Sequence, residues 1–533
     1  MIAKVWRRLA VTSGASALLA AFAVAPAGTA ASAATSGPRV LLVGTYQGRA
    51  GPYHTIQAAV DAAKPGDWIL VGPGDYHENA DLSGQTANVD QGGYGGVLIT
   101  TPGLHLRGMN RNDVIVDGTN AGSSACSSDP SDQNLGATSG GQQLGRNGIV
   151  VYRARGVSID NLTVCNFLAG SGDSGNQIWW DGGADTGQVG LFGYEGSYLT
   201  ATSTYFGGEA TAATYGIFSG NSSGGSWDQI YASNFNDSGM YVGACKQVCN
   251  MVIDHAWMEY NPLGYSGTNS GGRIVIEHSQ FDHNQDGLDT NTQINGDPPA
   301  PQNGACPRNG ISPITHTHSC WVFIHNYVHD NNNPNVPAAG TASNGPTGTG
   351  MTVSGGRNDT VMDNVFADNG AWGALFIPYP DDNTPSLNQS CSKTGGVQTS
   401  GLGCVYDPQG DALLDNTFRH NGFFGNPSNA DYGQLAIDSG QPRNCYARNN
   451  APSGSVPSDL EESQPTCGPL TTKASAPSDL LNQVLCDTAV GACPAGAQYP
   501  PHSGVVMHPL PKLATMPNPC KGVPADAWCP SGG

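Results

Sequence analysis

The stretch VIEHSQFDHNQDGLD, residues 275–289, concentrates side chains that can move protons or bind metal ions. Its acidic and histidine residues are Glu277, His278, Asp282, His283, Asp286 and Asp289. Paired carboxylates act as general acid and base, and carboxylate oxygens with imidazole nitrogens bind divalent cations. The alternative is that these polar residues belong to the architecture. The elements that position them decide between these possibilities.

The nine-residue pattern IEHSQFDHN, which starts at Ile276, returns along the chain. Its echoes start at Ile253, Phe323, Val361 and Leu413, and a weaker copy starts at Ile230. Position one is apolar, and so is position six, which is occupied by Met258, Phe281, Val328, Phe366 and Phe418. Position nine is asparagine in five copies: Asn261, Asn284, Asn331, Asn369 and Asn421. Short strands separated by turn residues at about 23-residue spacing are typical of a β-solenoid.

With these repeats the sequence resembles the right-handed parallel β-helix, or pectin-lyase-like, superfamily over about residues 40–450. The segment YHTIQAAVDAAKPGDWILVGPGDYHE, residues 53–78, strengthens the resemblance, because such proteins begin with a helix that caps the first coils. We therefore predict an all-β fold, a right-handed parallel β-helix solenoid with an N-terminal capping helix. Long loop insertions are expected near residues 292–319, 332–349 and 378–410.

In a solenoid, equivalent repeat positions form columns whose members lie about 4.8 Å apart. Position three carries His255, His278 and His325, followed by Asp363 and Asp415. We predict that these histidines and the asparagines of position nine form ladders in the turns, where they satisfy backbone groups. A three-histidine metal column is the alternative.

Positions five and seven flank the inward position six and therefore point outward. They bring Glu259, Asp282 and His329 together as predicted catalytic residues, with Trp257 and Tyr327 as predicted sugar-binding residues. Carboxyl groups on adjacent coils would lie about 5 Å apart, near the separation found in retaining glycosidases. The alternative is a solvated polar face with scattered aromatic residues.

Two further sets of residues are predicted to bind ligands. Arg273 and Arg357 each follow Ser-Gly-Gly and are candidates for contact with a substrate carboxylate, unless each pairs with a neighbouring acid. Asp286 and Asp289 are candidate metal ligands, with Ca²⁺ as the cofactor that oxygen ligands suit. The alternative is that Asp286 and Gly287 form a turn.

Residues 1–33 have a basic start, an apolar run and a small-residue cleavage pattern, which predict a signal peptide and a secreted protein. Residues 34–450 are predicted to form the β-helix domain, and 451–533 a Pro- and Cys-rich C-terminal extension. The chain has 22 basic and 42 acidic residues and a net charge of −20, which predicts neither a nucleic-acid nor a membrane partner.

The chain contains 14 cysteines, and in an exported protein these are expected to form disulfides. Pairing of near neighbours predicts Cys126–Cys165, Cys306–Cys320, Cys391–Cys404, Cys445–Cys467, Cys486–Cys493 and Cys520–Cys529. Cys245 and Cys249 are expected to be a disulfide or inert thiols rather than metal ligands.

The resemblance implies a secreted polysaccharide-active enzyme, of glycoside hydrolase or polysaccharide lyase type, whose partner is a polysaccharide or another glycan. The characteristic motif sets of polygalacturonases and alginate epimerases are absent. The alternative is therefore a non-catalytic carbohydrate-binding or adhesin β-helix. The sequence does not indicate an oligomeric state.

Overall fold

The computed structural model describes residues 37–81, 94–171, 174–183, 188–245, 248–293, 303–338, 342, 344–381, 391–400, 403–437, 444–467, 478–486, 493 and 495–532. The predicted signal peptide, residues 1–33, lies outside these ranges.

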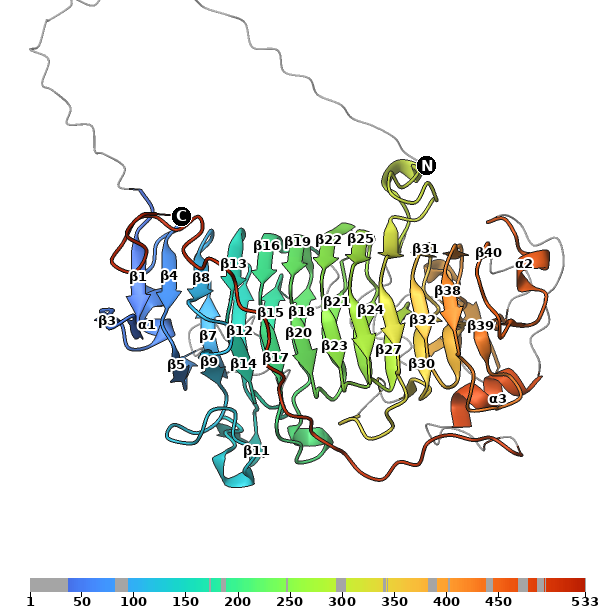
Figure 1. Cartoon of the computed structure of the whole chain (residues 1–533), viewed down its shortest axis with the longest axis horizontal. Coiled ribbons are helices and arrows are strands. Elements are labelled where there is room, and N and C mark those ends of the chain that lie inside the picture. Colours follow the sequence, from blue (N-terminus) through green and yellow to red (C-terminus); the bar gives the residue numbers. More distant parts are fainter. Residues whose placement is uncertain are drawn as a thin grey trace, which may run out of the picture. The chain divides into compact units, whose positions relative to one another are not determined.

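The chain winds through three long sheets, and each coil apart from those at the two ends adds one strand to each sheet (Figure 1). Sheet 1 contains β1 (Val40–Val43), β4 (Trp68–Val71), β8 (His105–Gly108), β13 (Val157–Asp160), β16 (Leu191–Ser197), β19 (Ser222–Asp228), β22 (Val248–Asp254), β25 (Gly272–Glu277), β28 (Trp321–Ile324), β31 (Asp359–Met362), β37 (Ala412–Leu414) and β40 (Cys445–Ala447). Sheet 2 contains β5 (Gly74–Tyr76), β9 (Val114–Asp117), β14 (Thr163–Cys165), β17 (Thr200–Thr202), β20 (Tyr231–Ser233), β23 (Trp257–Glu259), β26 (Gln280–Asp282), β29 (Tyr327–His329), β32 (Val365–Ala367) and β38 (Thr417–Arg419).

Sheet 3 closes each coil. It contains β6 (Ala80–Asp81), β7 (Tyr94–Ile99), β12 (Asn147–Tyr152), β15 (Ile178–Asp181), β18 (Tyr215–Gly220), β21 (Ser238–Gly243), β24 (Leu263–Thr268), β27 (Asp286–Asn291), β30 (Thr349–Ser354), β33 (Trp372–Ile377), β39 (Ala430–Gln434) and β41 (Ser455–Val456). Every described pairing within the three sheets is parallel except β6 with β7. The predicted parallel β-helix is confirmed.

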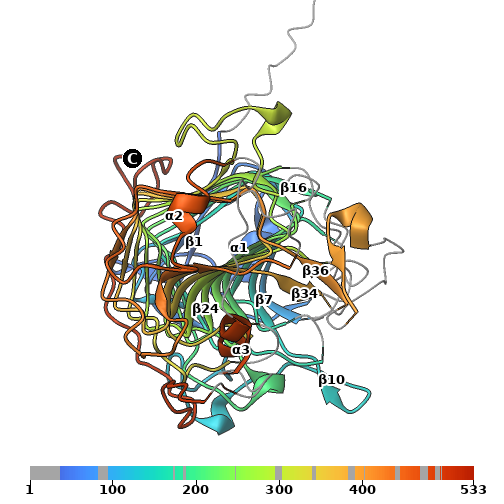
Figure 2. The same ribbon diagram turned by 90° about the vertical axis from the view of Figure 1, so that its right-hand side faces the viewer.

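The predicted insertions flank sheet 3. Two of them connect sheet 3 to sheet 1, between β27 and β28 and between β33 and β37. The third connects β29 of sheet 2 to β30 of sheet 3. The connection between β33 and β37 carries a small antiparallel sheet of β34 (Tyr379–Asp381), β35 (Val397–Gln398) and β36 (Cys404–Tyr406), which projects beside the solenoid (Figure 2).

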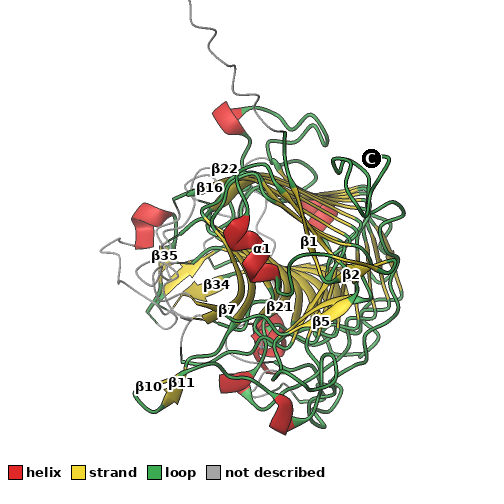
Figure 3. Cartoon of the chain, turned by 90° about the vertical axis from the view of Figure 1, so that its left-hand side faces the viewer, coloured by secondary structure: helices red, strands yellow, loops and turns green. Residues whose placement is uncertain are grey.

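A helix covers the N-terminal end of the solenoid, as predicted (Figure 3). It is α1 (Ile56–Ala62), which begins after Thr55, whose side chain accepts a hydrogen bond from the Ala58 amide. This is a favourable N-cap. Ile56, Ala59 and Val60 are buried and join the main core. At the other end, α2 (Leu460–Ser463) contributes the fully buried Leu460 to the same core.

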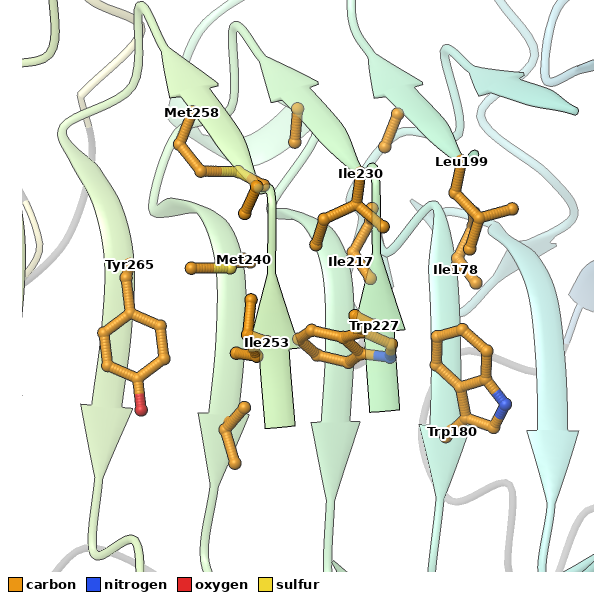
Figure 4. Packing of buried hydrophobic residues seen from close by; sticks show 14 of the residues in the cluster. Ile178, Trp180, Leu199, Ile217, Trp227, Ile230, Met240, Ile253, Met258 and Tyr265 are labelled. Carbon is orange, nitrogen blue, oxygen red and sulfur yellow. The ribbon is translucent and has the colours of Figure 1, made fainter. Parts of the chain in front are cut away.

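The apolar repeat positions line the interior. Ile253 pairs with Ile276 in sheet 1, and Met258 with Phe281 in sheet 2, and all four are buried. Trp180, Trp227 and Tyr265 belong to the same core and continue this packing along the solenoid axis (Figure 4).

The weak repeat copy at Ile230 was wrong. Trp227, not Ile230, pairs with Ile253. The coil from Trp227 to Ile253 is three residues longer than the next one, from Ile253 to Ile276. One of these residues lies between the paired positions Ala232 and Met240, and two lie between Met240 and Ile253, the stretch that contains the Cys245–Cys249 disulfide.

The asparagines of position nine form a buried ladder between sheets 2 and 3. Asn331, for example, donates from Nδ2 to the Phe281 carbonyl and to Asn369 Oδ1, both at 3.1 Å. Its Oδ1 accepts from the amide and the side chain of Asn284, at 3.3 and 3.0 Å. The predicted ladder is confirmed, and a second one occupies the turn between sheets 1 and 2, through Asn326, Asn364, Asn416 and Asn449.

We expect Asn331→Ala to lower the free energy of unfolding by about 3 kcal/mol, because it leaves several buried groups without a partner at about 1–3 kcal/mol each. Urea denaturation of a chain that starts at residue 34 measures the change. Asn120→Ala, at an exposed position, is the control and should change stability by about 0.5 kcal/mol or less. Equal stability of Asn331→Ala and the unmodified protein would show that the ladder contributes nothing.

The C-terminal extension runs back along the solenoid (Figure 1). We call residues 498–532 the strap. Its backbone hydrogen-bonds to the side chains of Asn335, Asn234 and Asn112, which belong to turns of widely separated coils. Near its end, Trp528 donates from Nε1 to the Arg49 carbonyl and packs on Tyr46.

Five predicted disulfides are present: Cys126–Cys165, Cys306–Cys320, Cys391–Cys404, Cys445–Cys467 and Cys520–Cys529. Cys245 and Cys249 also form a disulfide, in agreement with the non-metal prediction. The predicted pair Cys486–Cys493 involves a side chain outside the described ones. Among the described residues, no helix has the length and apolar character needed to span a membrane.

Candidate active site

The outer face of sheet 2 carries the predicted catalytic residues. Strand register places Glu259, Asp282 and His329 in one column on β23, β26 and β29. Trp257 and Tyr327 lie in the neighbouring column, two rungs apart. The structure therefore brings together the residues that the repeat aligned.

Glu259 and Asp282 are held by neighbouring side chains. The Tyr231 hydroxyl donates to Glu259 Oε1 at 2.6 Å. Asp282 Oδ1 accepts from Trp257 Nε1 at 2.7 Å, and Gln280 Nε2 lies 3.0 Å from the same oxygen. Burial, with the nearby Asp282 carboxylate, raises the pKa of Glu259 to about 7. A carboxyl group in this range can donate and accept protons near neutral pH.

His283, rather than His329, contacts the carboxylate pair. His283 Nδ1 lies 2.6 Å from Asp282 Oδ2, and this hydrogen bond raises the pKa of the imidazole. His329 instead bonds to Asp330 at 2.8 Å and stacks on Tyr327 with 3.9 Å between ring centroids. His283 occupies position eight of the repeat, in the turn after the strand, and it is not among the catalytic residues that the repeat predicts.

The strap crosses the solenoid beside this pair. Its His508 stacks on Tyr260, the residue after Glu259, with 3.7 Å between ring centroids and 5° between planes. His508 and Asn234 also exchange two hydrogen bonds, at 2.9 and 3.1 Å. Part of the sheet 2 face is therefore occupied by the chain itself.

Asp286 and Asp289 lie on the outer face of sheet 3 instead. Both belong to β27, so the alternative of a turn at Asp286–Gly287 was wrong. Thr352 Oγ1, on the next rung, is 2.9 Å from Asp286 Oδ2 and 2.7 Å from Asp289 Oδ1. A hydroxyl has one proton to donate. The arrangement is satisfied when one carboxyl is protonated and donates to Thr352, while Thr352 donates to the other.

Burial and the charge of Asp289 raise the pKa of Asp286 well above its ordinary value. Burial also raises the pKa of Asp289, although hydrogen bonds from Ser354, Asn291 and Thr352 oppose this by stabilising the charged form. The proton is therefore favoured on Asp286, and the negative charge on Asp289. Asp237 lies directly before β21, two coils earlier than Asp286. Its pKa is raised to about 7, mainly by burial.

The four carboxylate oxygens of this pair already have protein partners. Asp286 Oδ1 accepts a hydrogen bond from the Leu288 amide, and Asp289 Oδ2 accepts one from the Asn291 side chain. Asp286 Oδ2 and Asp289 Oδ1 both lie next to the Thr352 hydroxyl, and Asp289 Oδ1 also accepts from Ser354. Ca²⁺ requires six to eight oxygen ligands. These residues fit a shared proton better than a calcium ion, and the calcium assignment stays a prediction.

A row of aromatic residues leads to Asp289 along the same column. Register pairs Trp179 with Phe218, Phe218 with Tyr241, Tyr241 with Ser266, and Ser266 with Asp289. The rings stack, with centroids 5.3 and 4.9 Å apart. Sequence reasoning missed this row, although the outward alternation in GIFSG and GMYVG carries its signal.

The two arginines have different surroundings. Arg357 donates to the Thr394 carbonyl at 3.1 Å and lies over the Tyr406 ring, beneath the insertion that contains β36. Arg273 is exposed at the start of β25, where its backbone has a φ of 61°. Substrate contact by either arginine stays a prediction.

No protein-family model matches the sequence, and no curated protein matches it. The chain is similar to the solved structure of the Azotobacter vinelandii mannuronan C-5 epimerase AlgE4 A-module, with 12% identity and a TM-score of 0.42 over 74% of this chain and 90% of that one. For the alginate lyase from Paenibacillus sp. str. FPU-7 the values are 10%, 0.34, 77% and 94%. For the polygalacturonase from Erwinia carotovora ssp. carotovora they are 10%, 0.37, 75% and 96%. The strand pairing described above establishes the parallel β-helix independently of these likenesses.

Proposed function

We propose that this protein is a secreted polysaccharide-active enzyme that hydrolyses a neutral glycan on the outer face of sheet 3. The observation that carries the proposal is the Asp286–Thr352–Asp289 chain, in which one hydroxyl lies within hydrogen-bond distance of two carboxyl groups. Such a chain holds a mobile proton, which is what general acid–base catalysis requires.

Asp289 is the proposed catalytic residue, because it retains 7% exposure whereas Asp286 is fully buried. Asp286 supplies its proton through Thr352, so that Asp289 donates a proton to the glycosidic oxygen as the bond to the leaving sugar breaks. Water then adds to the sugar carbon and returns its proton to Asp289, from which Thr352 passes a proton back to Asp286. The sum of these steps is hydrolysis, with one water consumed.

The charge around Asp289 favours a neutral substrate. Asp289 keeps its negative charge while Asp286 holds the proton, and the whole chain has a net charge of −20. A uronate polymer would be repelled from such a site without a compensating cation. Trp179 and Phe218 are buried and stack on their neighbours, whereas Tyr241 at the end of the row is partly exposed. Tyr241 therefore supports glycan binding, since sugars pack their apolar faces against aromatic rings.

A second candidate is the predicted set Glu259, Asp282 and His329 on sheet 2. The raised pKa of Glu259, about 7, favours it. The strap contact at Tyr260 argues against a long glycan on that face. The alternative of a non-catalytic binding protein predicts glycan binding without products.

The experiment that tests the proposal is mass spectrometry of products after incubation of the mature protein with a panel of neutral and acidic polysaccharides, with and without a chelator. Hydrolysis gives fragments one water heavier than the internal repeat, and we expect these from a neutral polymer in both conditions. Unsaturated fragments from a uronate polymer would establish a lyase instead. No fragments from any polymer would contradict the enzyme proposal.

A further inference from the structure

Three histidines stack in the turn between sheets 1 and 2. They are His255, His278 and His325, on successive coils, each with a left-handed backbone conformation at φ of 52°, 48° and 57°. Their ring centroids are 5.5 and 5.6 Å apart, with planes 28° and 14° from parallel. We call these three residues the histidine ladder.

A column of acidic residues runs beside the ladder. Register places Asp228, Asp254 and Glu277 on consecutive rungs of sheet 1. Asp254 Oδ1 lies 2.8 Å from His255 Nδ1 and 3.0 Å from His278 Nδ1, so one carboxylate oxygen serves two imidazoles.

These residues form two overlapping groups of possible ligands. The first is Asp254, His255 and His278, and the second is Glu277, His278 and His325. Within each group the ligand atoms lie within 4.8 Å of one another. His278 belongs to both groups.

We propose that the histidine ladder and its acidic column form a binding site for a divalent transition-metal ion such as Zn²⁺. Two imidazole nitrogens and one carboxylate oxygen are the donors that this ion prefers. The fourth position is open to water. Glu277, His278 and His325 provide a second, adjacent position for an ion, with His278 as the ligand that both positions share.

The geometry is close to what an ion needs. Ligand atoms on a tetrahedral Zn²⁺ ion lie about 3.3 Å apart, given metal–ligand distances of about 2.0–2.1 Å. The Nδ1–Oδ1 distances of 2.8 and 3.0 Å therefore need to widen only slightly when a metal ion replaces the hydrogens between these atoms.

The site is accessible and its side chains have room to adjust. The side chains of His255 and His278 are 50% and 49% exposed, and that of Asp254 is 34% exposed. The strand after each histidine belongs to sheet 2, so the ladder lies on a different side of the coil from Asp289 on sheet 3. Metal binding here is independent of the proposed catalytic chain.

A purely structural ladder is the competing interpretation. The same column continues as Asp363 and Asp415 in later coils. The turn therefore accepts other residues, and the fold does not require histidine on three successive rungs.

Isothermal titration of the tag-free mature protein with ZnCl₂ tests the proposal, after extraction with a chelator. We expect saturable binding, and at least a tenfold weaker affinity in His278→Gln, which removes a ligand from both groups. His255→Gln and His325→Gln should each abolish one group and leave the other. Unchanged circular dichroism and Tm without metal would show that each variant is folded.

His420→Gln is the matched control. His420 also follows a short strand, has φ of 52° and bonds through Nδ1 to a carboxylate, that of Asp368, at 2.8 Å. Its ring stacks on Phe423 and not on a second histidine. Its replacement should leave Zn²⁺ affinity unchanged. The proposal is overturned if the unmodified protein does not bind Zn²⁺. It is also overturned if His278→Gln, like the His420→Gln control, binds Zn²⁺ as tightly as the unmodified protein.

Discussion

Asp289→Asn should lower kcat/KM on the cleaved polysaccharide by about 10²–10⁴-fold, the range that one positioned acid–base group contributes. The amide keeps the size of the side chain and can still meet Thr352 and Ser354, so the fold is retained. It cannot deliver a proton. Initial rates of reducing-end formation with purified variants measure the loss.

Asp286→Asn should have a smaller effect on rate and a distinct effect on the pH profile. Asp286 is fully buried and acts through Thr352, so its loss removes the proton supply and shifts the limb of the profile that reports the catalytic acid. Asp363→Asn, at an exposed position in the turn between sheets 1 and 2, is the control and should leave the rate unchanged. Full activity of Asp289→Asn together with inactivity of Glu259→Gln would move the active site to sheet 2.

Raising the pH from 5 to 8 should lower the free energy of unfolding by about 3 kcal/mol or more. Burial raises the pKa of Asp237 and of Glu259 to about 7, and that of Asp359 to about 8. Unfolded carboxyls titrate near pH 4. Between these values the folded state binds more protons than the unfolded state, so stability is fully present below about pH 4 and is lost as pH rises through 7 to 8.

The sharpest single contribution is expected from a buried pair inside the solenoid. Asp359 accepts from Thr290 at 2.8 Å, and its amide donates to Asp411 Oδ1 at 2.8 Å. Burial, with the charge of Asp359, raises the pKa of Asp411 well above its ordinary value. Deprotonation of both would place two charges in an apolar interior, which is costly.

Asp411→Asn should therefore flatten the dependence of stability on pH. The chain already places Asn444 on the next rung, where its Oδ1 accepts from the Asp411 amide at 2.9 Å, so an amide fits this column. Asp415→Asn, at a carboxylate that pairs with the exposed Arg448, is the matched control. Urea denaturation at pH 5, 6.5 and 8 gives the slopes, and a stability that rises between pH 5 and 8 would contradict the argument.

The fold could be predicted because its determinants are local and repeated. Apolar positions one and six and the asparagine at position nine recur in the five copies that start at Ile253, Ile276, Phe323, Val361 and Leu413, and the register confirms them. The copy at Ile230 is wrong because equal spacing does not fix strand pairing. The coil before Ile253 is three residues longer than the next one, with one extra residue before β21 and two after it.

The candidate site on sheet 3 was harder to recognise. The aromatic row joins Trp179, Phe218, Tyr241 and, two rungs on, Asp289 across coils of unequal length, so no fixed spacing in the sequence connects them. The charge of Asp286 and Asp289 marks them as candidate ligands in the sequence. Thr352, which links the two carboxyl groups, is 63 residues from Asp289. Only the pairing of β27 with β30 brings it there.

The strap changes how this solenoid is expected to unfold. In a repeat protein each coil contacts only its neighbours, so the ends can unravel while the middle persists. Here a single segment is bonded to turns near Asn112, Asn161, Asn234 and Asn335. Loss of one coil must also break its link to distant coils through that segment. The strap therefore converts a sequential, end-to-end melting process into a more cooperative one, and this linkage forms only after residues 498–532 have been synthesised.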